Sequence, residues 1–348
     1  MIRKTKGKLL ITGGAGFIGS RCVHHFGSNG YEVTLVDNLS RKGADYNLKW
    51  LQKTANFHFY QSDICDYPSM QTVFQHEGPF DAIIHLAAQV AVTTSVIDPR
   101  TDFNINAGGS FNVLECFRLL SPDALFIYSS TNKVYGELSR IELTEGEYRY
   151  QLADTTGITE SQMLDFHSPY GCSKGCADQY VIDYARIYGL HTVSFRQSCI
   201  YGERQLGVED QGWVAWFIIA ASLGIPISIY GDGKQVRDLL HVEDLVNLYE
   251  LAILNRNLLK GEVFNIGGGY DNSLSILEFI EFLKETKIPI RYSYGAMRAG
   301  DQKIFISNNI KAKEFLNWQP VINCREGIIR LKNWVYNHQD LLKQLNGL

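Results

Sequence analysis

Residues 8–19 read Lys8-Leu-Leu-Ile-Thr-Gly-Gly-Ala-Gly-Phe-Ile-Gly19, and this stretch decides the fold. Lys8–Thr12 has the apolar pattern of a short buried strand, and a helical pattern follows the glycines. Gly13, Gly16 and Gly19 recur at every third position. Glycines at this spacing let the chain turn tightly and approach a pyrophosphate at the N-terminus of the helix. The stretch predicts a strand–turn–helix that binds a dinucleotide; the alternative is a tight turn without a ligand.

Strand and helix patterns alternate through the rest of the first half. We expect strands at residues 32–37, 57–61, 81–86, 124–128, 191–196 and 263–267. A long helix is expected from the Asp98-Pro99 start to about Leu120. This alternation predicts an α/β fold, a Rossmann-type doubly wound parallel sheet with a smaller C-terminal lobe.

The bulk composition excludes several classes of protein. The chain has 348 residues, 45% of them hydrophobic and 20% charged, with a net charge of −4. This charge gives no electrostatic reason to expect nucleic acid or an anionic membrane as a partner, and no apolar run is long enough for a membrane helix. The seven cysteines are scattered without metal-ligand spacing, so we expect reduced thiols, a cytoplasmic location and no metal site.

Asp37 ends the second predicted strand, eighteen residues after Gly19. An acid at this point hydrogen-bonds the adenosine ribose and repels a 2′-phosphate, so it favours NAD over NADP. Arg41 and Lys42 follow closely and would weaken that preference. The alternative is that Asp37 is a turn residue.

Other cofactor candidates follow the next strands. Asp63-Ile64 is placed to meet an adenine, or it simply begins a loop. The small residues of Ala87-Ala88-Gln89 would let a cofactor lie against the end of strand 81–86. Asn106, in the long helix, either bonds across to neighbouring loops or is buried and satisfied.

Three side chains have the chemistry of a proton-transfer site. Thr131 follows the strand 124–128, where ligands bind in open α/β sheets. Tyr170 and Lys174 are four apart and share one face of a helix. A phenol ionises near pH ~10, and a nearby ammonium, aided by the positive charge of a cofactor, favours the phenolate. The alternatives are a polar loop and a helix-surface pair.

Taken together, these residues resemble the extended short-chain dehydrogenase/reductases that act on nucleotide sugars. The resemblance covers essentially the whole chain and implies NAD as cofactor and Thr131, Tyr170 and Lys174 as the catalytic triad. The implied cofactor-binding residues are Gly13, Gly16, Phe17, Ile18, Gly19, Asp37, Asn38, Leu39, Ser40, Arg41, Asp63, Ile64, Leu86, Ala87, Ala88, Gln89, Asn106, Ser129, Tyr170, Lys174 and Gln197.

The resemblance also implies the organisation of the chain. Residues 1–196 would be mainly the NAD-binding Rossmann domain, and residues 197–348 mainly the nucleotide-sugar-binding lobe, with segments crossing between them. Helices near 100–120 and 170–188 would pack against copies of themselves in a homodimer or homotetramer.

Five strings resemble one subgroup of that family, the 2-epimerases that convert CDP-paratose to CDP-tyvelose in O-antigen biosynthesis. They are Asp37-Asn-Leu-Ser-Arg-Lys-Gly43, Ser130-Thr-Asn-Lys-Val-Tyr-Gly136, Asp165-Phe-His-Ser-Pro-Tyr-Gly-Cys-Ser-Lys-Gly175, Asp210-Gln-Gly-Trp-Val214 and Gly233-Lys-Gln-Val-Arg-Asp238. This resemblance implies a CDP-linked dideoxyhexose as substrate and oxidation at C2.

Asn132 and Lys133 separate neighbouring activities. Sugar 4,6-dehydratases of the family resemble Thr-Asp-Glu at this loop, where the acid pair removes and returns protons. An amide cannot be a general acid, and a lysine has the wrong charge to replace a glutamate. The remaining chemistry is the removal and return of a hydride, which is epimerisation.

The second half offers arginines for a substrate diphosphate. By resemblance, Arg237 and Arg298 clamp the diphosphate; the alternative is a pair of surface arginines. Arg204 and Gln205 are candidates for phosphate or base contacts, or else solvated loop residues. Many relatives have, where Cys199 stands, an asparagine that contacts a substrate phosphate. The side chain of cysteine has no amide, so the resemblance does not extend this phosphate contact to Cys199.

Two other functions stay open. A UDP-hexose 4-epimerase would use the same hydride chemistry with the sugar in another register. A non-catalytic, dinucleotide-binding redox sensor would need neither the Tyr170–Lys174 pair nor the diphosphate arginines.

Overall fold

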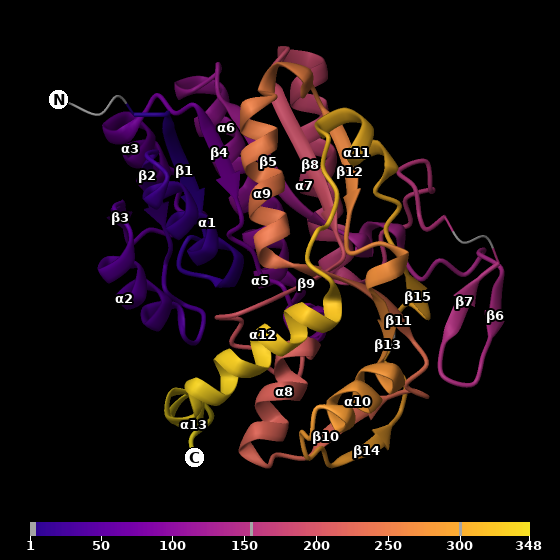
Figure 1. Ribbon diagram of the computed structural model, residues 1–348. Helices are drawn as coiled ribbons and strands as arrows, with labels where there is room; N and C mark the ends of the chain where they lie inside the picture. Colours follow the sequence, from indigo (N-terminus) through magenta and orange to yellow (C-terminus); the bar gives the residue numbers. More distant parts are fainter. Residues whose placement is uncertain (1–4, 154–155, 299–300) are drawn as a thin grey trace. The chain divides into compact units, whose positions relative to one another are not determined.

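The computed structural model describes residues 5–153, 156–298 and 301–348. The chain forms two compact units, and each is assembled from three separate segments (Figure 1). The first unit contains Met1–Thr131, Ser168–Arg196 and Val246–Phe264, and the second contains Asn132–His167, Gln197–Leu245 and Asn265–Leu348. The chain therefore leaves and re-enters each unit, and one of these passages follows Arg196, where the predicted boundary lies.

A seven-stranded sheet is the centre of the first unit, in the order β12-β8-β5-β4-β1-β2-β3. The strands are β1 (Lys8–Thr12), β2 (Glu32–Val36), β3 (His58–Tyr60), β4 (Ala82–His85), β5 (Leu125–Thr131), β8 (His191–Gln197) and β12 (Glu262–Ile266). The pairs from β5 through β4, β1 and β2 to β3 are parallel. The strand order reverses between β1 and β4, and such a switch point is where open α/β sheets bind ligands. The predicted fold class is confirmed.

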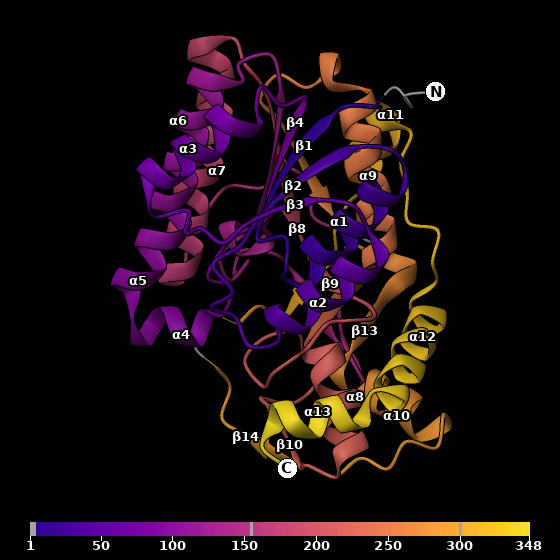
Figure 2. The ribbon, with the colours of Figure 1, turned by 90° about the vertical axis from the view of Figure 1, so that its left-hand side faces the viewer.

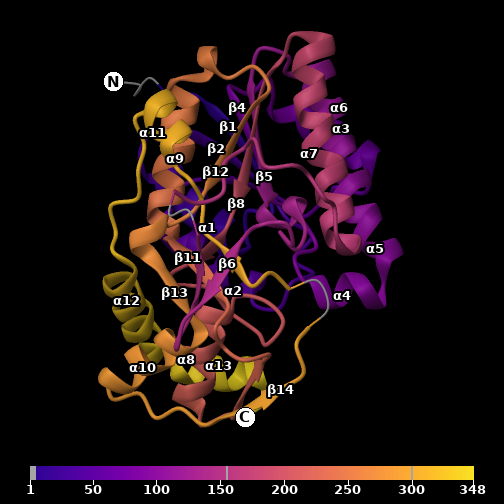
Figure 3. The ribbon, with the colours of Figure 1, turned by 90° about the vertical axis from the view of Figure 1, so that its right-hand side faces the viewer.

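Helices cover both faces of this sheet. They are α1 (Phe17–Ser28), α2 (Ala44–Thr54), α3 (Tyr67–Glu77), α4 (Val92–Ile97), α5 (Pro99–Phe103), η1 (Asn104–Gly109), α6 (Ser110–Leu120), α7 (Ser168–Tyr188), α9 (Val242–Leu254) and η3 (Arg256–Leu258). Figures 2 and 3 show α3, α6 and α7 on one face, and α1 and α9 on the other. Apolar side chains of α3, α6 and α7 pack on the sheet in one buried cluster, because their apolar residues recur on one side of each helix.

The helix expected from Pro99 to Leu120 differs from the prediction in its middle. Residues 104–109 form a π-turn between α5 and α6. A Cβ atom on Gly109 would lie 2.6 Å from Cδ1 of Ile64, so only glycine permits this close approach. A second difference concerns Thr131, which ends β5 and does not lie in a loop after it.

The second unit contains small sheets and a separate helical core. Its strands are β6 (Leu143–Glu145), β7 (Tyr150–Leu152), β9 (Cys199–Tyr201), β10 (Ile227–Tyr230), β11 (Val236–His241), β13 (Ser273–Ser275), β14 (Tyr292–Gly295) and β15 (Ile304–Phe305). Its helices are η2 (Asn132–Tyr135), α8 (Trp213–Leu223), η4 (Tyr270–Asn272), α10 (Ile276–Glu285), α11 (Ile310–Leu316), α12 (Cys324–Asn337) and α13 (Gln339–Asn346). The core lies among α8, α10, α12 and α13.

β11 organises the second unit, because it pairs with β9, β13 and β15. His241 is the last residue of this strand, and α9 begins directly after it. Asp244, in the first turn of α9, accepts hydrogen bonds from the backbone nitrogens of Val321 and Ile322 at 3.2 and 3.0 Å. Asp244 therefore joins the start of α9 to the segment that precedes α12. In the described part of the chain, no helix is long and apolar enough to cross a membrane.

Candidate active site

The glycine loop between β1 and α1 is packed as closely as a dinucleotide site requires. Gly13 has a φ of +67°, a left-handed conformation that favours glycine. A Cβ atom on Gly19 would lie 2.1 Å from the carbonyl oxygen of Gly13. Helix α1 follows Gly16 with no side chain capping it and no acidic residue in its first turn. No acidic side chain of α1 itself therefore competes with a bound pyrophosphate for the N–H groups of its first turn.

Asp37 ties this loop to the turn after β2. Its Oδ2 accepts a hydrogen bond from the backbone nitrogen of Ala15 at 3.0 Å, and its Oδ1 accepts one from Leu39 at 2.8 Å. Leu39 has a φ of +59°, which is unusual for a residue with a side chain. Burial raises the pKa of the Asp37 carboxyl, although these backbone N–H groups act to lower it. Asp37 is therefore a turn residue, and its position at the end of β2 is also the one expected of a ribose ligand.

Asn38 and Asp63 join the ends of β2 and β3. The Asn38 amide donates to Oδ2 of Asp63 at 2.9 Å, and the backbone nitrogen of Cys65 donates to Oδ1 at 2.8 Å. Burial acts to raise the pKa of Asp63, but the hydrogen bonds from Cys65 and Asn38 lower it overall. The structure thus brings together the residues that were predicted to meet the adenosine.

The loop after β4 is held by Asn106. The Asn106 Oδ1 accepts from the backbone nitrogen of Gln89 at 2.9 Å, and its Nδ2 donates to the carbonyl oxygen of Gln89 at 3.0 Å. Asn106 is fully buried, so both predicted alternatives, bonding across to a loop and being satisfied, describe it. At the carboxyl ends of β1, β2 and β4 the chain thus has a glycine turn, an acid and a fixed small-residue loop. These features fit NAD, with the pyrophosphate against the glycine loop and the adenosine ribose near Asp37.

Helix α7 carries Tyr170 and Lys174 beside the end of β5. Lys174 Nζ donates to the carbonyl oxygen of Ser129 at 2.6 Å, and it lies 4.2 Å from the centre of the Tyr128 ring. The Tyr170 backbone nitrogen donates to Ser95 Oγ at 3.1 Å. The Tyr170 side chain forms a hydrogen bond with Thr131. The predicted trio of Thr131, Tyr170 and Lys174 therefore converges in the first unit.

Burial dominates the pKa values of this pair. It raises the pKa of Tyr170 to about 12, while the hydrogen bond with Thr131 acts to lower it. It lowers the pKa of Lys174 to about 7, against the carboxylates of Asp178 and Asp102, which act to raise it. The expected lowering of the Tyr170 pKa by Lys174 is therefore absent from the chain by itself, because desolvation disfavours both charged forms. A cofactor's positive charge would act in the required direction.

A buried carboxylate that the sequence did not reveal adjoins this pair. Asp102, 1% exposed, accepts from Ser173 Oγ at 2.5 Å. Its other oxygen accepts from Gln89 Nε2 at 2.9 Å and from Asn106 Nδ2 at 3.1 Å. Ser173 lies between Tyr170 and Lys174 on α7, so Asp102 joins α7 to the loop after β4. In the sequence, the four-residue spacing of Asp102 and Asn106 is the signal that could have pointed to Asp102.

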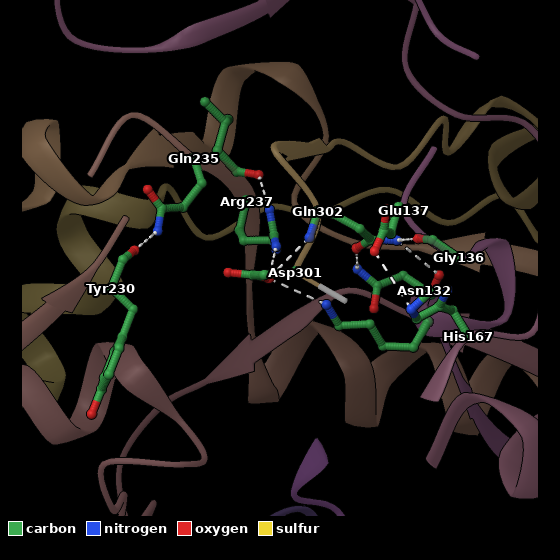
Figure 4. Close-up of polar contacts among 11 residues, drawn as sticks. Asn132, Gly136, Glu137, His167, Tyr230, Gln235, Arg237, Asp301 and Gln302 are labelled. Atoms are coloured by element: carbon green, nitrogen blue, oxygen red, sulfur yellow. Dashed lines mark hydrogen bonds and ion pairs between the residues drawn. The ribbon is translucent and has the colours of Figure 1, made fainter. Parts of the chain in front are cut away.

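Of the predicted substrate-binding residues, Thr131 lies in the first unit, and Arg204, Gln205, Arg237 and Arg298 lie in the second. Arg237, on β11, donates Nη2 to Oδ1 of Asp301 at 2.7 Å (Figure 4). Lys133 Nζ reaches the same oxygen at 3.3 Å. Arg237 is thus held in place by an acid three residues after Arg298, and Asp301 itself was not among the predicted residues.

Arg298 makes different contacts. Its guanidinium donates to Oδ1 of Asp210 at 3.0 Å and stacks 3.8 Å from the centre of the Tyr230 ring. The Tyr230 hydroxyl donates to Glu209 at 2.8 Å, and Gln235 donates to the Tyr230 carbonyl oxygen at 2.6 Å. Tyr230 was missed because an aromatic residue in a strand reads as core.

Arg204 and Gln205 are both buried, at 8% and 4% exposed. The alternative that they are solvated loop residues is therefore wrong. Gln205 Nε2 donates to the carbonyl oxygen of Ile200 at 3.1 Å, and Arg204 has a φ of +70°. Burial raises the pKa of the nearby Cys199 thiol to about 12, so Cys199 stays neutral.

Comparison with known proteins agrees with this arrangement. Residues 9–267 match the model of the NAD dependent epimerase/dehydratase family, which spans both the glycine loop and Arg237. The chain belongs to this family. NAD is its cofactor, as the sequence predicted.

Individual members of the family are similar along their whole length. The CDP-paratose 2-epimerase of Salmonella typhi is 46% identical over 334 residues, covering 94% of this chain and 98% of that protein. A solved UDP-glucose 4-epimerase from Thermotoga maritima, with UDP-glucose, is 34% identical with a TM-score of 0.80, covering 96% and 99% of the two chains. A UDP-glucuronic acid 4-epimerase from Bacillus cereus, solved with UDP-glucuronic acid and NAD, is 26% identical with a TM-score of 0.81, covering 95% and 99%.

Within the part of this family member that the structure describes, no group of three or more His, Cys, Asp or Glu side chains is placed to hold a metal ion. The expected resemblance to nucleotide-sugar epimerases is confirmed by the family and by its relatives.

Proposed function

We propose that this chain is an isomerase that epimerises CDP-paratose to CDP-tyvelose at C2. The observation that carries the proposal is the 46% identity to a CDP-paratose 2-epimerase over 94% of the chain. Asn132 and Lys133 support it, because neither side chain can replace the acid pair that an elimination requires.

The proton chemistry falls to the residues of the first unit. Tyr170 accepts the proton of the C2 hydroxyl, and Thr131, its hydrogen-bond partner, binds or relays at that oxygen. NAD, when bound, supplies a reversible hydride acceptor. Lys174 in its protonated form favours the phenolate of Tyr170. After the 2-ketone turns its other face, the hydride would return to C2 and Tyr170 would return the proton to the C2 oxygen, so the reaction has no net redox change.

The nucleotide diphosphate is assigned to the second unit. Arg237 and Arg298 are proposed to bind its phosphates, because arginine binds phosphates bidentately. Arg204 and Gln205 are proposed to contact phosphate or base. A CDP-linked sugar is preferred on the strength of the paratose relative, and a screen of CDP-, UDP- and dTDP-linked sugars measures this preference.

A second candidate is a UDP-hexose 4-epimerase, which the 34% identity to the Thermotoga maritima UDP-glucose 4-epimerase favours. The deciding experiment incubates the enzyme with CDP-paratose and, separately, with UDP-glucose, and follows the configurations at C2 and C4 by NMR. We expect CDP-tyvelose from the first reaction. Formation of UDP-galactose without any CDP-tyvelose would reject the proposal.

A second copy of the chain is the proposed partner of one helical face in the first unit. Large apolar side chains are exposed along α4, α5, α6 and α7. Figure 2 shows these helices on one side of the sheet. They are Val96, Ile97, Phe103, Phe111, Leu119, Tyr180, Ile187 and Tyr188. Ile97 and Ile187 are 84% and 65% exposed, which is unfavourable in water and favours burial against another copy. The predicted homodimer or homotetramer and a reducing cytoplasmic location, for which seven free cysteines argue, remain predictions.

A further inference from the structure

Lys133 is a partly buried cation that the proton and hydride chemistry does not use. Its side chain is 19% exposed, and its Nζ lies 3.3 Å from Oδ1 of Asp301. The same oxygen accepts from Arg237 Nη2 at 2.7 Å and from the backbone nitrogen of Gln302 at 3.0 Å (Figure 4). The ammonium and the guanidinium therefore share one carboxylate oxygen, and the two nitrogens are no farther apart than the sum of their distances to it.

Two cations so close together disfavour each other's charge when they are removed from water. Burial lowers the pKa of Lys133 and Arg237 acts in the same direction, while the carboxylates of Asp301 and Glu137 oppose them. Oε1 of Glu137 also lies 3.5 Å from Nε2 of His167. A bound dianion at this point would stabilise both cations, and a diphosphate is such a group.

The backbone that carries Lys133 is fixed by its neighbour. The Asn132 amide donates to Oε1 of Gln302 at 3.3 Å, and Gln302 Nε2 donates to the carbonyl oxygen of Gly136 at 2.6 Å. Asn132 therefore forms a hydrogen bond with Gln302, and the next residue, Lys133, forms one with Asp301. An acidic side chain in place of Lys133 would be repelled by the carboxylate of Asp301. The environment of residue 133 therefore favours a cation.

The chemistry of the reaction indicates which substituent of the sugar such a cation would bind. A 4,6-elimination oxidises C4 and removes a proton from C5, so the acids that relatives carry at positions 132 and 133 serve the ring carbon next to the oxidised one. When C2 is oxidised, the neighbouring carbon that bears a substituent is C1. Its substituent is the diphosphate, which a lysine can bind and a glutamate would repel.

Building on the proposed function, we propose that Lys133, together with Arg237, binds the β-phosphate of the nucleotide sugar and so selects C2 rather than C4 for oxidation. The β-phosphorus is three bonds from C2 and five bonds from C4. Lys133 follows Thr131 by two residues, so their Cα atoms are at most about 7.6 Å apart. A β-phosphate bound by Lys133 thus keeps C2 near the catalytic hydroxyl, and C4 lies farther along the ring.

The first test measures phosphate recognition without turnover. Dissociation constants for CDP and CMP are determined by calorimetry with the NAD-loaded enzyme, since only CDP has a β-phosphate. We expect Lys133→Met to weaken CDP binding about tenfold or more, the effect of losing a charged hydrogen bond, and to leave CMP binding within about twofold. Lys133→Arg should restore much of the loss.

A matched control is Lys234→Met, which removes a partly exposed lysine of the same unit that is paired with Glu145 at 2.8 Å. It should leave both dissociation constants unchanged. Unchanged CMP binding also verifies that Lys133→Met is folded. Equal CDP affinities for Lys133→Met and wild type would overturn the proposal.

The second test measures directly whether C2 or C4 of the sugar is epimerised. A 3,6-dideoxyhexose such as paratose has free ring hydroxyls only at C2 and C4, so NMR of the product distinguishes the two epimers from one substrate. We expect Lys133→Met to form less C2 epimer and a larger share of C4 epimer than wild type. An unchanged product ratio would overturn the selection of C2. Absence of any epimer with wild type would instead reject the proposed function, while the CDP and CMP comparison would still decide the role of Lys133.

Discussion

The hydroxyl of Ser173 lies 2.5 Å from the buried carboxylate of Asp102, and this contact joins α7 to α5, the helix that precedes the π-turn. Asp102 also acts to raise the pKa values of both Tyr170 and Lys174. We therefore treat Asp102 as a positioning residue, because it reaches the reaction only through these neighbours.

Asp102→Asn keeps the side-chain shape and removes the charge. Both Tyr170 and Lys174 should then titrate at lower pH, so the pH profile of kcat/KM should move to lower pH. Rates of C2 epimerisation from pH 6 to about 10 measure this shift. The control is Asp98→Asn, at the N-cap of α5, whose carboxylate accepts from Thr101 N at 3.0 Å. A profile identical to that of wild type would restrict Asp102 to a structural role.

Tyr170→Phe removes the proposed base and leaves the helix intact. Turnover should fall by about a hundredfold or more, as expected when a general base is lost. Bound NAD, read by absorbance after denaturation, should stay near the wild-type level. A variant that keeps more than a tenth of the turnover would reject Tyr170 as the base.

Lys174→Met tests the buried ammonium through stability. The pKa of Lys174 falls from its ordinary value of 10.5 to about 7 in the folded chain. Between these values the unfolded chain binds a proton that the folded chain does not, so the unfolding free energy of wild type should rise with pH relative to the variant. Urea unfolding of both nucleotide-free proteins from pH 6.5 to about 10 measures the difference. A difference that does not depend on pH would mean that Lys174 is not desolvated.

Gly19→Ala places a methyl group 2.1 Å from the carbonyl oxygen of Gly13. The loop must shift, which should cost about 1–3 kcal/mol of stability and most of the affinity for NAD. Calorimetric NAD titration and urea unfolding measure both effects. Gly108→Ala is the control, because a Cβ atom there meets nothing within 4 Å. Equal NAD affinity in Gly19→Ala and wild type would contradict the pyrophosphate assignment.

The proposed contact between copies is tested by a double substitution, Ile97→Glu with Ile187→Glu. Two charges in an apolar contact should dissociate the oligomer, and light scattering after size exclusion gives the mass. Leu254→Glu is the control, since Leu254 is 68% exposed on α9, which covers the other face of the sheet. If the double variant keeps the mass of an oligomeric wild type, or if wild type is itself a monomer, the assignment of this face is wrong.

The sequence predicted the Rossmann sheet and its nucleotide edge because their signals are local. Gly13, Gly16 and Gly19 are close in the chain, and the strand patterns are short and apolar. Thr131 and Tyr170 are 39 residues apart, yet the resemblance predicted their proximity, and the structure shows their hydrogen bond.

What the sequence could not give depends on desolvation and on distant pairs. The sequence predicted a lowered pKa for Tyr170, but burial raises it. The spacing of Tyr170 and Lys174 does not show that the phenol is buried. Asp301 and Lys133 are 168 residues apart, and their contact has no local signature. The π-turn at 104–109 and the close approach of Gly109 to Ile64 are not revealed by a helical pattern of apolar residues.

The interleaved connectivity of the two units bears on how the protein can be made. A chain ending at Arg196 contains most of the first unit but lacks its third segment, Val246–Phe264, and lacks all of β12. Strand β8 would then be an uncovered edge, a template for aggregation. During synthesis on the ribosome, the first unit therefore cannot be completed until residue 264 has emerged. Because each unit consists of three separate segments, neither can be produced from one continuous part of the gene.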